Sequence, residues 1–472
     1  MKNNSHILNV INKLQTGEGS AMSVYFIGIG GIGMSALARY FNSRGVEVSG
    51  YDKTATQLTM QLQAEGIAIH YEDNIDLIKK DAALVIYTPA VSLDHKEYNF
   101  FLENGYTIMK RSEVLGLITH DTFNICVAGT HGKTTTSTMI AHILRHSEYG
   151  CNAFLGGIAS NYETNFWGSE KNVCVVEADE YDRSFLKLNP DIAIITAIDP
   201  DHLDIYGTAE KFAEAFVEFS GKVKEDGILI SKYGLENSDN FKSPRNITYS
   251  LNDRKANCYA SNISIANGSY LFDVKMNEEV VENISLNMGG LHNIENAVAS
   301  IAVAKKIGIS NDKIKSAISA FKGVKRRFEY IIKNDSMVMI DDYAHHPQEL
   351  NALIKGAKGL YPNKKCTVVF QPHLYSRTRD FAEGFAAALN LADEVFLLPI
   401  YPAREKPIAG TESEMVASKM DVQKATCCTK EALIECIKKE KNNNTIEMLI
   451  MAGAGDIDTM ILPIKNILEQ VV

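Results

Sequence analysis

A glycine-rich run that directly follows an apolar strand pattern constrains this chain more than any other feature of its sequence. The strand pattern covers Phe123–Ala128, and the run after it reads Gly-Thr-His-Gly-Lys-Thr-Thr-Thr over residues 129–136. The usual phosphate-binding pattern has two glycines separated by four residues before Lys-Ser/Thr. Here Val127 occupies the place of the first glycine, so the run is a shortened form of that pattern. It predicts a loop on an open α/β sheet in which backbone N–H groups and a helix N-terminus surround a phosphate.

The residue types in this loop match the chemistry that ATP requires. Lys133 can reach the terminal phosphates, and the Thr134 hydroxyl can bind a magnesium ion that accompanies the nucleotide. A glycine-rich turn without a nucleotide is the alternative, but Gly-Lys-Thr-Thr-Thr between a strand and a helix pattern rarely arises by chance. We therefore predict an ATP site. Its loop contacts would be Gly129, Thr130, His131, Gly132, Lys133, Thr134 and Thr135.

The length and charge of the chain limit the remaining possibilities. A chain of 472 residues exceeds one hydrophobic core, so two to four domains are expected. No apolar stretch is long enough to span a bilayer, and the net charge of −10 gives no overall attraction to nucleic acid. The eight cysteines show no metal-ligand spacing, and Met1–Ser20 lacks a secretory pattern. We predict a cytoplasmic protein without nucleic-acid partner or membrane insertion; its oligomeric state stays open.

A second glycine-rich turn lies near the start of the chain. The strand pattern Val24–Ile27 leads into Gly-Ile-Gly-Gly-Ile-Gly at residues 28–33, and a second pattern, Glu47–Tyr51, is followed by Asp52. Such glycines allow a tight turn and close approach of a diphosphate, while the acidic residue can hydrogen-bond a ribose or base. The ligand is either a nicotinamide dinucleotide or another diphosphate-bridged compound such as a UDP-sugar. Its expected contacts are Gly28, Gly30, Gly31, Gly33 and Asp52.

Two β-rich runs after the phosphate loop end in polar residues. Val173–Glu177 precedes Ala-Asp-Glu, and Ile192–Ile198 precedes Asp-Pro-Asp-His, in which the histidine is His202. Ligands gather at the carboxyl ends of strands in open parallel sheets. We therefore predict that Thr134, Glu177 and His202 are metal ligands. For Glu177 the alternative is a solvated acidic loop, and for His202 it is an ordinary loop histidine.

The rest of the central segment combines β-structure with one prominent helix. Residues 240–288 are expected to be antiparallel, with a hairpin signal, Asn-Gly, at residues 267–268. The helix pattern Ile294–Ile307 follows, and side chains at its start can hydrogen-bond an adenine edge or stack on its face. An asparagine-rich helix cap is the alternative. The adenine candidates are His292, Asn293 and Asn296.

A second alternation of strands and helices begins after about residue 328. The strand patterns are Met337–Ile340, Cys366–Phe370, Glu394–Leu398 and Ile446–Met451. Polar residues follow them at 341–347, 371–373 and 452–456, where a doubly wound sheet would bind ligands. Arg326 and Arg327 precede this segment and suit a phosphate clamp, although a solvated charge pair is the alternative. Candidate side chains within it are Asp342, Tyr343, His345, His373 and Arg377, the last two for a carboxylate.

These patterns predict an α/β fold of three domains. The first, over residues 1–121, is Rossmann-like and binds a nucleotide-linked ligand. The second, over residues 122–328, is of the P-loop ATPase type, with a parallel sheet and added antiparallel β-structure. The third, over residues 329–472, is again Rossmann-like.

The ordered motifs resemble the Mur ligase family across nearly the whole chain, from Val24 to the C-terminal helix. They are Gly-x-Gly-x-x-Gly, Gly-Thr-His-Gly-Lys-Thr, Glu-Ala-Asp-Glu, Asp-His-Leu-Asp, His-Asn-x-x-Asn-Ala, Arg-Arg-Phe-Glu and Asp-Asp-Tyr-x-His-His-Pro. The shortened phosphate loop is that family's form and is shared with folylpolyglutamate synthetases. Two positions depart from the common pattern. Ala344 replaces a frequent glycine, and Leu374 replaces a frequent arginine, which removes one potential contact to an amino-acid carboxylate.

The resemblance implies a specific reaction. Residues 25–35 are similar to members that join L-alanine to UDP-N-acetylmuramate in peptidoglycan precursor synthesis, with ATP converted to ADP and phosphate through an acyl phosphate. It implies a UDP-sugar at the first glycine-rich turn, magnesium at Thr134, Glu177 and His202, and the amino acid in the third domain. The implied catalytic residues are Lys133, His202, Asp342 and His345. ATP would also contact His292, Asn293, Asn296 and Arg327, and the amino acid would contact Tyr343, His373 and Arg377.

Three other interpretations stay open. A murein tripeptide ligase would share the sugar nucleotide and most motifs, and would differ in the amine that it accepts. An NAD-dependent oxidoreductase would explain the first glycine-rich turn but not the Gly-Lys-Thr loop. A P-loop regulatory switch or transport ATPase would explain that loop but not the first domain.

Overall fold

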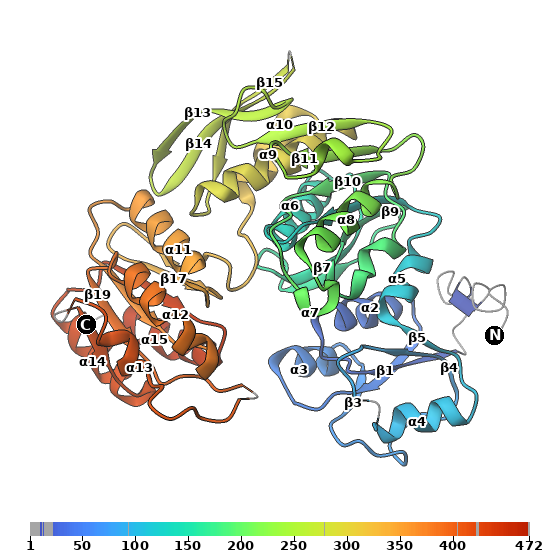
Figure 1. The fold of residues 1–472 in the computed structure, drawn as a ribbon, viewed down its shortest axis with the longest axis horizontal. Coiled ribbons are helices and arrows are strands. Elements are labelled where there is room, and N and C mark those ends of the chain that lie inside the picture. Colours follow the sequence, from blue (N-terminus) through green and yellow to red (C-terminus); the bar gives the residue numbers. More distant parts are fainter. Residues whose placement is uncertain are drawn as a thin grey trace.

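The computed structural model describes residues 10–11, 13, 22–92, 94–277, 279–403, 405–421 and 424–470, with the backbone alone at 203–204. Most of the segment Met1–Ser20 lies outside these residues. Within the described chain, three sheets with flanking helices follow one another along the sequence (Figure 1). Among the helices that the structure describes, none combines the length and the apolar character needed to cross a bilayer.

The first sheet carries its glycine-rich turn where the strand order reverses. The order is β3-β2-β1-β4-β5, and neighbouring strands are parallel. The reversal lies at β1, and the turn follows β1, so the turn faces the crevice in which such sheets bind ligands. The elements are β1 (Ser23–Ile27), α2 (Ile32–Ser43), β2 (Glu47–Tyr51), α3 (Gln57–Ala64), β3 (Ala68–His70), β4 (Ala82–Tyr87), α4 (Lys96–Glu103), β5 (Ile108–Lys110) and α5 (Arg111–Ile118).

The central sheet has a parallel core with antiparallel strands at its two ends. Its order is β15-β14-β13-β12-β11-β10-β6-β9-β7-β8. Its strands are β6 (Phe123–Ala128), β7 (Asn152–Ala159), β8 (Thr164–Trp167), β9 (Val173–Glu177), β10 (Ile192–Ile195), β11 (Ile228–Lys232), β12 (Asn246–Ser250), β13 (Cys258–Ala266), β14 (Ser269–Met276) and β15 (Glu279–Leu286). The helices are α6 (Lys133–His146), α7 (Leu203–Tyr206), α8 (Ala209–Ser220), α9 (Leu291–Lys306) and α10 (Asn311–Ala320), with short 3₁₀ turns η1 (Tyr181–Lys187) and η2 (Ser238–Asn240).

The third sheet is parallel except for its first strand. Its order is β16-β17-β21-β18-β19-β20, and β16 runs antiparallel to β17. Because β21 lies between β17 and β18, the polar segments that follow these three strands meet at one edge of the sheet. The strands are β16 (Glu329–Lys333), β17 (Val338–Asp342), β18 (Cys366–Phe370), β19 (Glu394–Leu397), β20 (Ala425–Cys427) and β21 (Met448–Ala452). The helical elements are α11 (Pro347–Leu360), α12 (Tyr375–Leu389), α13 (Ser413–Ala417), α14 (Lys430–Asn442), η3 (Asp456–Met460) and α15 (Ile461–Glu469).

Two expectations about the central strands need correction. The antiparallel structure expected over residues 240–288 begins only at β13, because β12 pairs in parallel with both β11 and β13. The strand expected over Ile192–Ile198 ends at Ile195. Thr196 donates its N–H to Ala128 O at the end of β6, at 3.0 Å, and turns its hydroxyl to the His131 carbonyl of the phosphate loop. The predicted hairpin at residues 267–268 is confirmed between β13 and β14.

The tip of that hairpin contacts the third unit. Lys333 Nζ donates to Gly268 O at 3.2 Å, and Tyr330 lies beside the same carbonyl. Figure 1 shows the β13–β14 hairpin extending toward the third unit, which lies beside α9. The central and third units therefore touch at this tip as well as through the connecting segment before β16.

The first and central units share a packed interface. Helix α2 lies against β7 and β8, where the Tyr40 ring contacts Phe154 and Phe166 with ring centroids 5.4 and 5.8 Å away. The fully buried Asn165 of β8 donates to Ile32 O at 2.6 Å and accepts from Arg39 Nη1 at 2.5 Å. Ile32 O belongs to the glycine-rich turn, so one amide of the central unit fixes the ligand-binding turn of the first.

Asn165→Ala is expected to lower the free energy of unfolding by about 2–3 kcal/mol, because buried groups of α2 lose their hydrogen-bond partner. Urea unfolding followed by the fluorescence of Trp167, the single tryptophan and two residues away on β8, measures the change. The exposed Asn172, whose amide donates only to Asp121 O, provides the control Asn172→Ala, expected to change stability by less than about 0.5 kcal/mol. Equal effects of both substitutions would contradict this account.

Candidate active site

The phosphate loop is shaped by two glycines that adopt left-handed backbone conformations. Gly129 has φ 134°, and Gly132 has φ 80° immediately before α6. A Cβ at Gly129 would overlap Thr196, and one at Gly132 would lie 2.8 Å from Asn296 Oδ1. The loop is thus clasped between the end of β10 and the start of α9, with the N-terminus of α6 directed at the space in front of it. This is the geometry of an anion site.

Lys133 and Thr134 each contact an acidic residue at the end of β9 or just after it. Lys133 Nζ donates to Gly129 O and to Glu180 Oε1, both at 2.7 Å. The Thr134 hydroxyl donates to Glu177 Oε1 at 3.0 Å. The other Glu177 oxygen accepts from Gly156 N at 3.0 Å. Burial raises the pKa of Glu177, and the neighbouring Lys133 lowers it.

A cavity of about 710 Å³ joins the central and third units in front of this loop. Most of the residues predicted to bind ATP line it, together with Glu177 and two predicted catalytic residues of the third unit. Gly129, the remaining predicted ATP contact, is not in the lining, and its carbonyl accepts a hydrogen bond from Lys133 Nζ. The predicted residues in the lining are Thr130, His131, Gly132, Lys133, Thr134, Thr135, Glu177, His292, Asn293, Asn296, Arg327, Asp342 and His345.

The predicted adenine residues form a buried cluster at the start of α9. Asn293 Nδ2 donates to Gly289 O at 2.7 Å, and Asn296 Nδ2 donates to Asn293 Oδ1 at 3.2 Å. Burial lowers the pKa of His292, so the imidazole is neutral at neutral pH. The cluster packs against Gly132, and it offers an imidazole and an amide oxygen at the cavity wall.

His202 lies beside Glu180, the carboxylate that accepts from Lys133. Its Nε2 is 4.0 Å from Glu180 Oε1 and 3.7 Å from Asp201 Oδ2, and its ring packs edge-on against Tyr181. It is not in the cavity lining with Thr134 and Glu177. Among the described residues, no three side chains of His, Cys, Asp or Glu gather closely enough to form a ready-made metal site.

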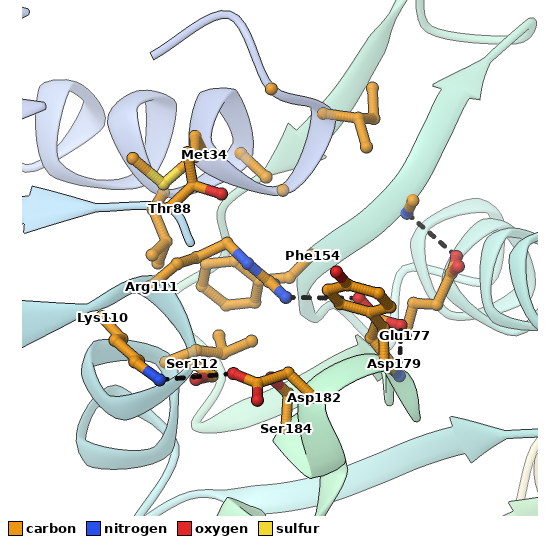
Figure 2. Close-up of a pocket in the computed structure, with 18 of the residues that line it drawn as sticks. Met34, Thr88, Lys110, Arg111, Ser112, Phe154, Glu177, Asp179, Asp182 and Ser184 are labelled. Carbon is orange, nitrogen blue, oxygen red and sulfur yellow. Dashed lines mark hydrogen bonds and ion pairs between the residues drawn. The ribbon is translucent and has the colours of Figure 1, made fainter. Parts of the chain in front are cut away.

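A second cavity, of about 430 Å³, lies between the first and central units (Figure 2). Gly31 and Gly33 line it, as predicted ligand contacts would. Gly30 and Asp52 do not: Gly30 N donates to Asp52 Oδ2 at 2.7 Å, so the carboxylate braces the turn itself. Gly28 has φ 85° and packs against Thr88.

Two basic residues of this cavity are not among the predicted site residues. Arg111 packs on Gly33 and lies 3.6 Å from Asp179 Oδ2, and Lys110 lies 3.3 Å from Asp182 Oδ2. Figure 2 shows both ion pairs across the cavity, from β5 and α5 to the segment after β9. Their signal in the sequence is a Lys-Arg pair at the end of β5, the same kind of position that the predicted acidic residues occupy at the end of β9.

The two cavities share one wall. Gly156 and Glu177 line both of them, because β7 and β9 are neighbours in the central sheet. A Cβ at Gly156 would overlap the Glu177 carboxylate, so this residue must be glycine if the carboxylate is to stay in place. A group bound in the first cavity can therefore meet a phosphate bound in the second beside Glu177.

The third unit contributes a connected row of polar side chains. His345 Nδ1 donates to Tyr343 O at 2.9 Å, which leaves Nε2 free of this bond, and the His345 and His373 rings are 6.2 Å apart. Arg377 Nη1 lies 3.5 Å from His373 Nδ1. Burial lowers the pKa of both histidines. The row runs away from the larger cavity, which only His345 of these four lines.

Asp342 stands at the base of this row. Its two oxygens accept from Phe328 N and Ala344 N, each at 2.7 Å. Burial raises its pKa to about 6, so it is ionised at neutral pH. Leu374, at the place of a frequent arginine, starts α12 with φ 71°, a strained conformation for a side chain without a local hydrogen bond of its own.

Comparison with known protein families assigns most of the chain. Residues 23–122 match the Mur ligase family catalytic domain, residues 127–304 the Mur ligase middle domain, and residues 326–457 the Mur ligase glutamate ligase domain. The chain belongs to the Mur ligase family. The predicted family resemblance is confirmed.

Relatives of known name agree with this assignment. The chain is 48% identical to the UDP-N-acetylmuramate–L-alanine ligase of Flavobacterium johnsoniae, over 95% of this chain and 98% of the relative. It is 48% identical to the ligase of the same name from Parabacteroides distasonis, over 94% and 97%.

Solved structures confirm the fold class of this Mur ligase. The UDP-N-acetylmuramate–alanine ligase of Thermotoga maritima superposes with a TM-score of 0.79 at 29% identity, over 94% of this chain and 98% of that one. A murein peptide ligase of Psychrobacter arcticus has a TM-score of 0.66 at 23% identity, over 96% and 99%, and shares the fold. The predicted three-part α/β architecture with parallel sheet cores is therefore confirmed.

Gly156→Ala is expected to lower the rate of ATP cleavage about 100-fold, since the added methyl group displaces Glu177 by about 1 Å or more. The measurement is phosphate release from ATP with all substrates present. Gly359→Ala in α11 is the control, because its Cβ meets no atom within 4 Å and alanine suits a helix interior. An unchanged rate for Gly156→Ala would show that the close contact with Glu177 does not matter.

Proposed function

We propose that this Mur ligase joins L-alanine to the lactyl carboxylate of UDP-N-acetylmuramate, converting ATP to ADP and phosphate, in the synthesis of a peptidoglycan precursor. The supporting observation is the shared wall of the two cavities, at which a carboxylate from one side meets a phosphate from the other. The names and coverage of the alanine-ligase relatives support the substrates. We infer a cytoplasmic location, where ATP and sugar nucleotides are available, and domain boundaries near residues 121 and 328.

ATP would occupy the larger cavity, with its phosphates on the loop and its adenine near the start of α9. The Thr134 hydroxyl and the Glu177 carboxylate are adjacent oxygen donors, which suits magnesium, an ion that takes a few protein oxygens and keeps waters and phosphate oxygens. We propose these two residues as its ligands, with His202 as a third candidate. Magnesium would offset the charge of the transferring phosphate.

UDP-N-acetylmuramate would occupy the smaller cavity. The N-terminus of α2 and the guanidinium of Arg111 both face it and suit a diphosphate, Arg111 through paired hydrogen bonds. Lys110 adds a second positive charge. The lactyl carboxylate would then point toward Gly156 and Glu177, because the opposite end of the ligand is fixed at the glycine-rich turn.

The reaction proceeds in two bond exchanges. A lactyl carboxylate oxygen attacks the γ-phosphorus, the bond to ADP breaks, and an acyl phosphate forms while Lys133 binds the transferring oxygens. The alanine amine then attacks the acyl carbon, loses a proton, and expels phosphate. His345 and His373 are neutral at neutral pH, so they do not repel an ammonium group and can accept its proton. Asp342 and Tyr343 would position the amine from the third unit, as Arg377 would position the carboxylate.

Phosphate release from ATP and magnesium with UDP-N-acetylmuramate is expected with L-alanine and not without the sugar nucleotide. Lys133→Ala should abolish it, since the transferring phosphate loses its fixed cation. Release only with the murein tripeptide in place of alanine would assign the protein to tripeptide recycling. Full activity of Lys133→Ala would refute the role of that residue.

Arg377→Ala should raise the KM for L-alanine at least about tenfold more than the KM for ATP, because a carboxylate loses its guanidinium partner while the nucleotide cavity is unchanged. Initial rates over both substrates measure the two constants. Arg379→Ala, two residues along α12 and paired with Asp380 on the surface, is the control. Equal changes in both KM values would remove Arg377 from the amino-acid site.

A further inference from the structure

Glu180, the last residue of the Glu-Ala-Asp-Glu motif, holds the phosphate-loop lysine, and it is not among the predicted site residues. Its side chain is 2% exposed, and its Oε1 accepts from Lys133 Nζ at 2.7 Å. Gly129 O accepts from the same nitrogen at 2.7 Å. An ammonium group has three N–H donors, so two are committed to fixed acceptors and the third remains for the cavity that Lys133 lines.

Glu180 is itself firmly held. Its carbonyl accepts from the Tyr206 hydroxyl at 2.5 Å and from Arg183 N at 3.0 Å. Tyr206 is buried against Phe212, with ring centroids 4.9 Å apart. The backbone of Glu180 is therefore fixed by the core beneath α8, and its anchoring does not involve Lys133.

The other acidic residues at the end of β9 and just after it have partners other than Lys133. Glu177 accepts from Thr134 and Gly156, and Asp179 lies beside Arg111. The second oxygen of Glu180 is buried and has no hydrogen-bond partner, which makes Lys133 the principal partner of this carboxylate. Burial raises the pKa of Glu180 and the charge of Lys133 lowers it, so the pair is electrostatically coupled.

We propose that Glu180 is a positioning residue for phosphoryl transfer: together with Gly129 O it holds the Lys133 ammonium group so that one N–H is directed at the phosphate. This inference rests on the proposed ATP-dependent ligation. It also changes how Lys133→Ala is interpreted, because that substitution leaves a buried carboxylate without its cation.

The test is a double-mutant cycle on nucleotide binding, combined with steady-state kinetics. Wild type, Glu180→Gln, Lys133→Ala and the double variant are titrated calorimetrically with magnesium and the non-hydrolysable analogue adenylyl imidodiphosphate. Glu180→Gln alone should lower kcat about 10- to 100-fold and leave the KM for the sugar nucleotide within about twofold. In the Lys133→Ala background it should change the Kd of the analogue less than about twofold, since no lysine is left to position.

Asp191→Asn is the matched control. Asp191 accepts from Lys224 Nζ at 2.7 Å, in another lysine–carboxylate pair of the central unit, and it lines neither cavity. It should leave kcat unchanged even if it lowers the melting temperature. If Glu180→Gln unfolds below the assay temperature, Glu180→Asp replaces it. The same result is expected for that variant: a lower kcat and a nearly unchanged KM for the sugar nucleotide.

Two results would overturn the proposal. One is a wild-type kcat for Glu180→Gln. The other is an equal loss of analogue affinity from Glu180→Gln with and without Lys133, which would mean that Glu180 acts through another group. Failure of the proposed function would look different: the wild type would bind the analogue, and the cycle could be completed, but phosphate release would not depend on the sugar nucleotide.

Discussion

The contact of Glu177 with Thr134 and Gly156 determines how the two ligand cavities meet. Both carboxylate oxygens are engaged at 3.0 Å, one from each side. The three parts come from adjacent strands, since β9 lies between β6, which leads into the phosphate loop, and β7, which carries Gly156. Strand spacing in the sheet therefore sets the separation of the transferring phosphate and its acceptor. Proximity of this kind is worth up to roughly 7–11 kcal/mol of a barrier when the geometry is right.

The central unit packs against the first unit and against the third unit in different ways. Toward the first unit, aromatic packing and the buried amide of Asn165 join α2 to β7 and β8. Toward the third unit, the contacts include the chain connection, the hairpin tip at Gly268 and the close approach of Gly356 in α11 to the backbone of Gly290. The smaller cavity, for the carboxylate, is thus built on the packed interface with the first unit, whereas the larger cavity, for the phosphate donor, is shared by the central unit and the third unit. Closure of that unit would exclude water from a hydrolysable acyl phosphate.

The sequence predicted those parts of the site that depend on local chain geometry. Glycines with φ above 0, a lysine at a helix start and polar residues after strands have local signals, and the structure brings thirteen of the predicted residues to one cavity. Contacts between distant segments had no such signal. Asp52 braces the glycine-rich turn, Glu180 is buried against Lys133, and Arg111 reaches a ligand cavity from a strand end. Each outcome depends on which element packs opposite, which one sequence does not specify.

Three basic side chains at the two cavities are each neutralised by an acidic residue of the segment that follows β9. Lys133 pairs with Glu180, Arg111 lies beside Asp179, and Lys110 pairs with Asp182. A partly buried cation without a counter-charge is costly, so the pairs stabilise the site before any ligand arrives. Only the first pair is deeply buried; the other two are partly exposed and weak. An anionic ligand can therefore displace the acids from Arg111 and Lys110 at little cost, whereas Lys133 keeps its carboxylate and offers its remaining donor.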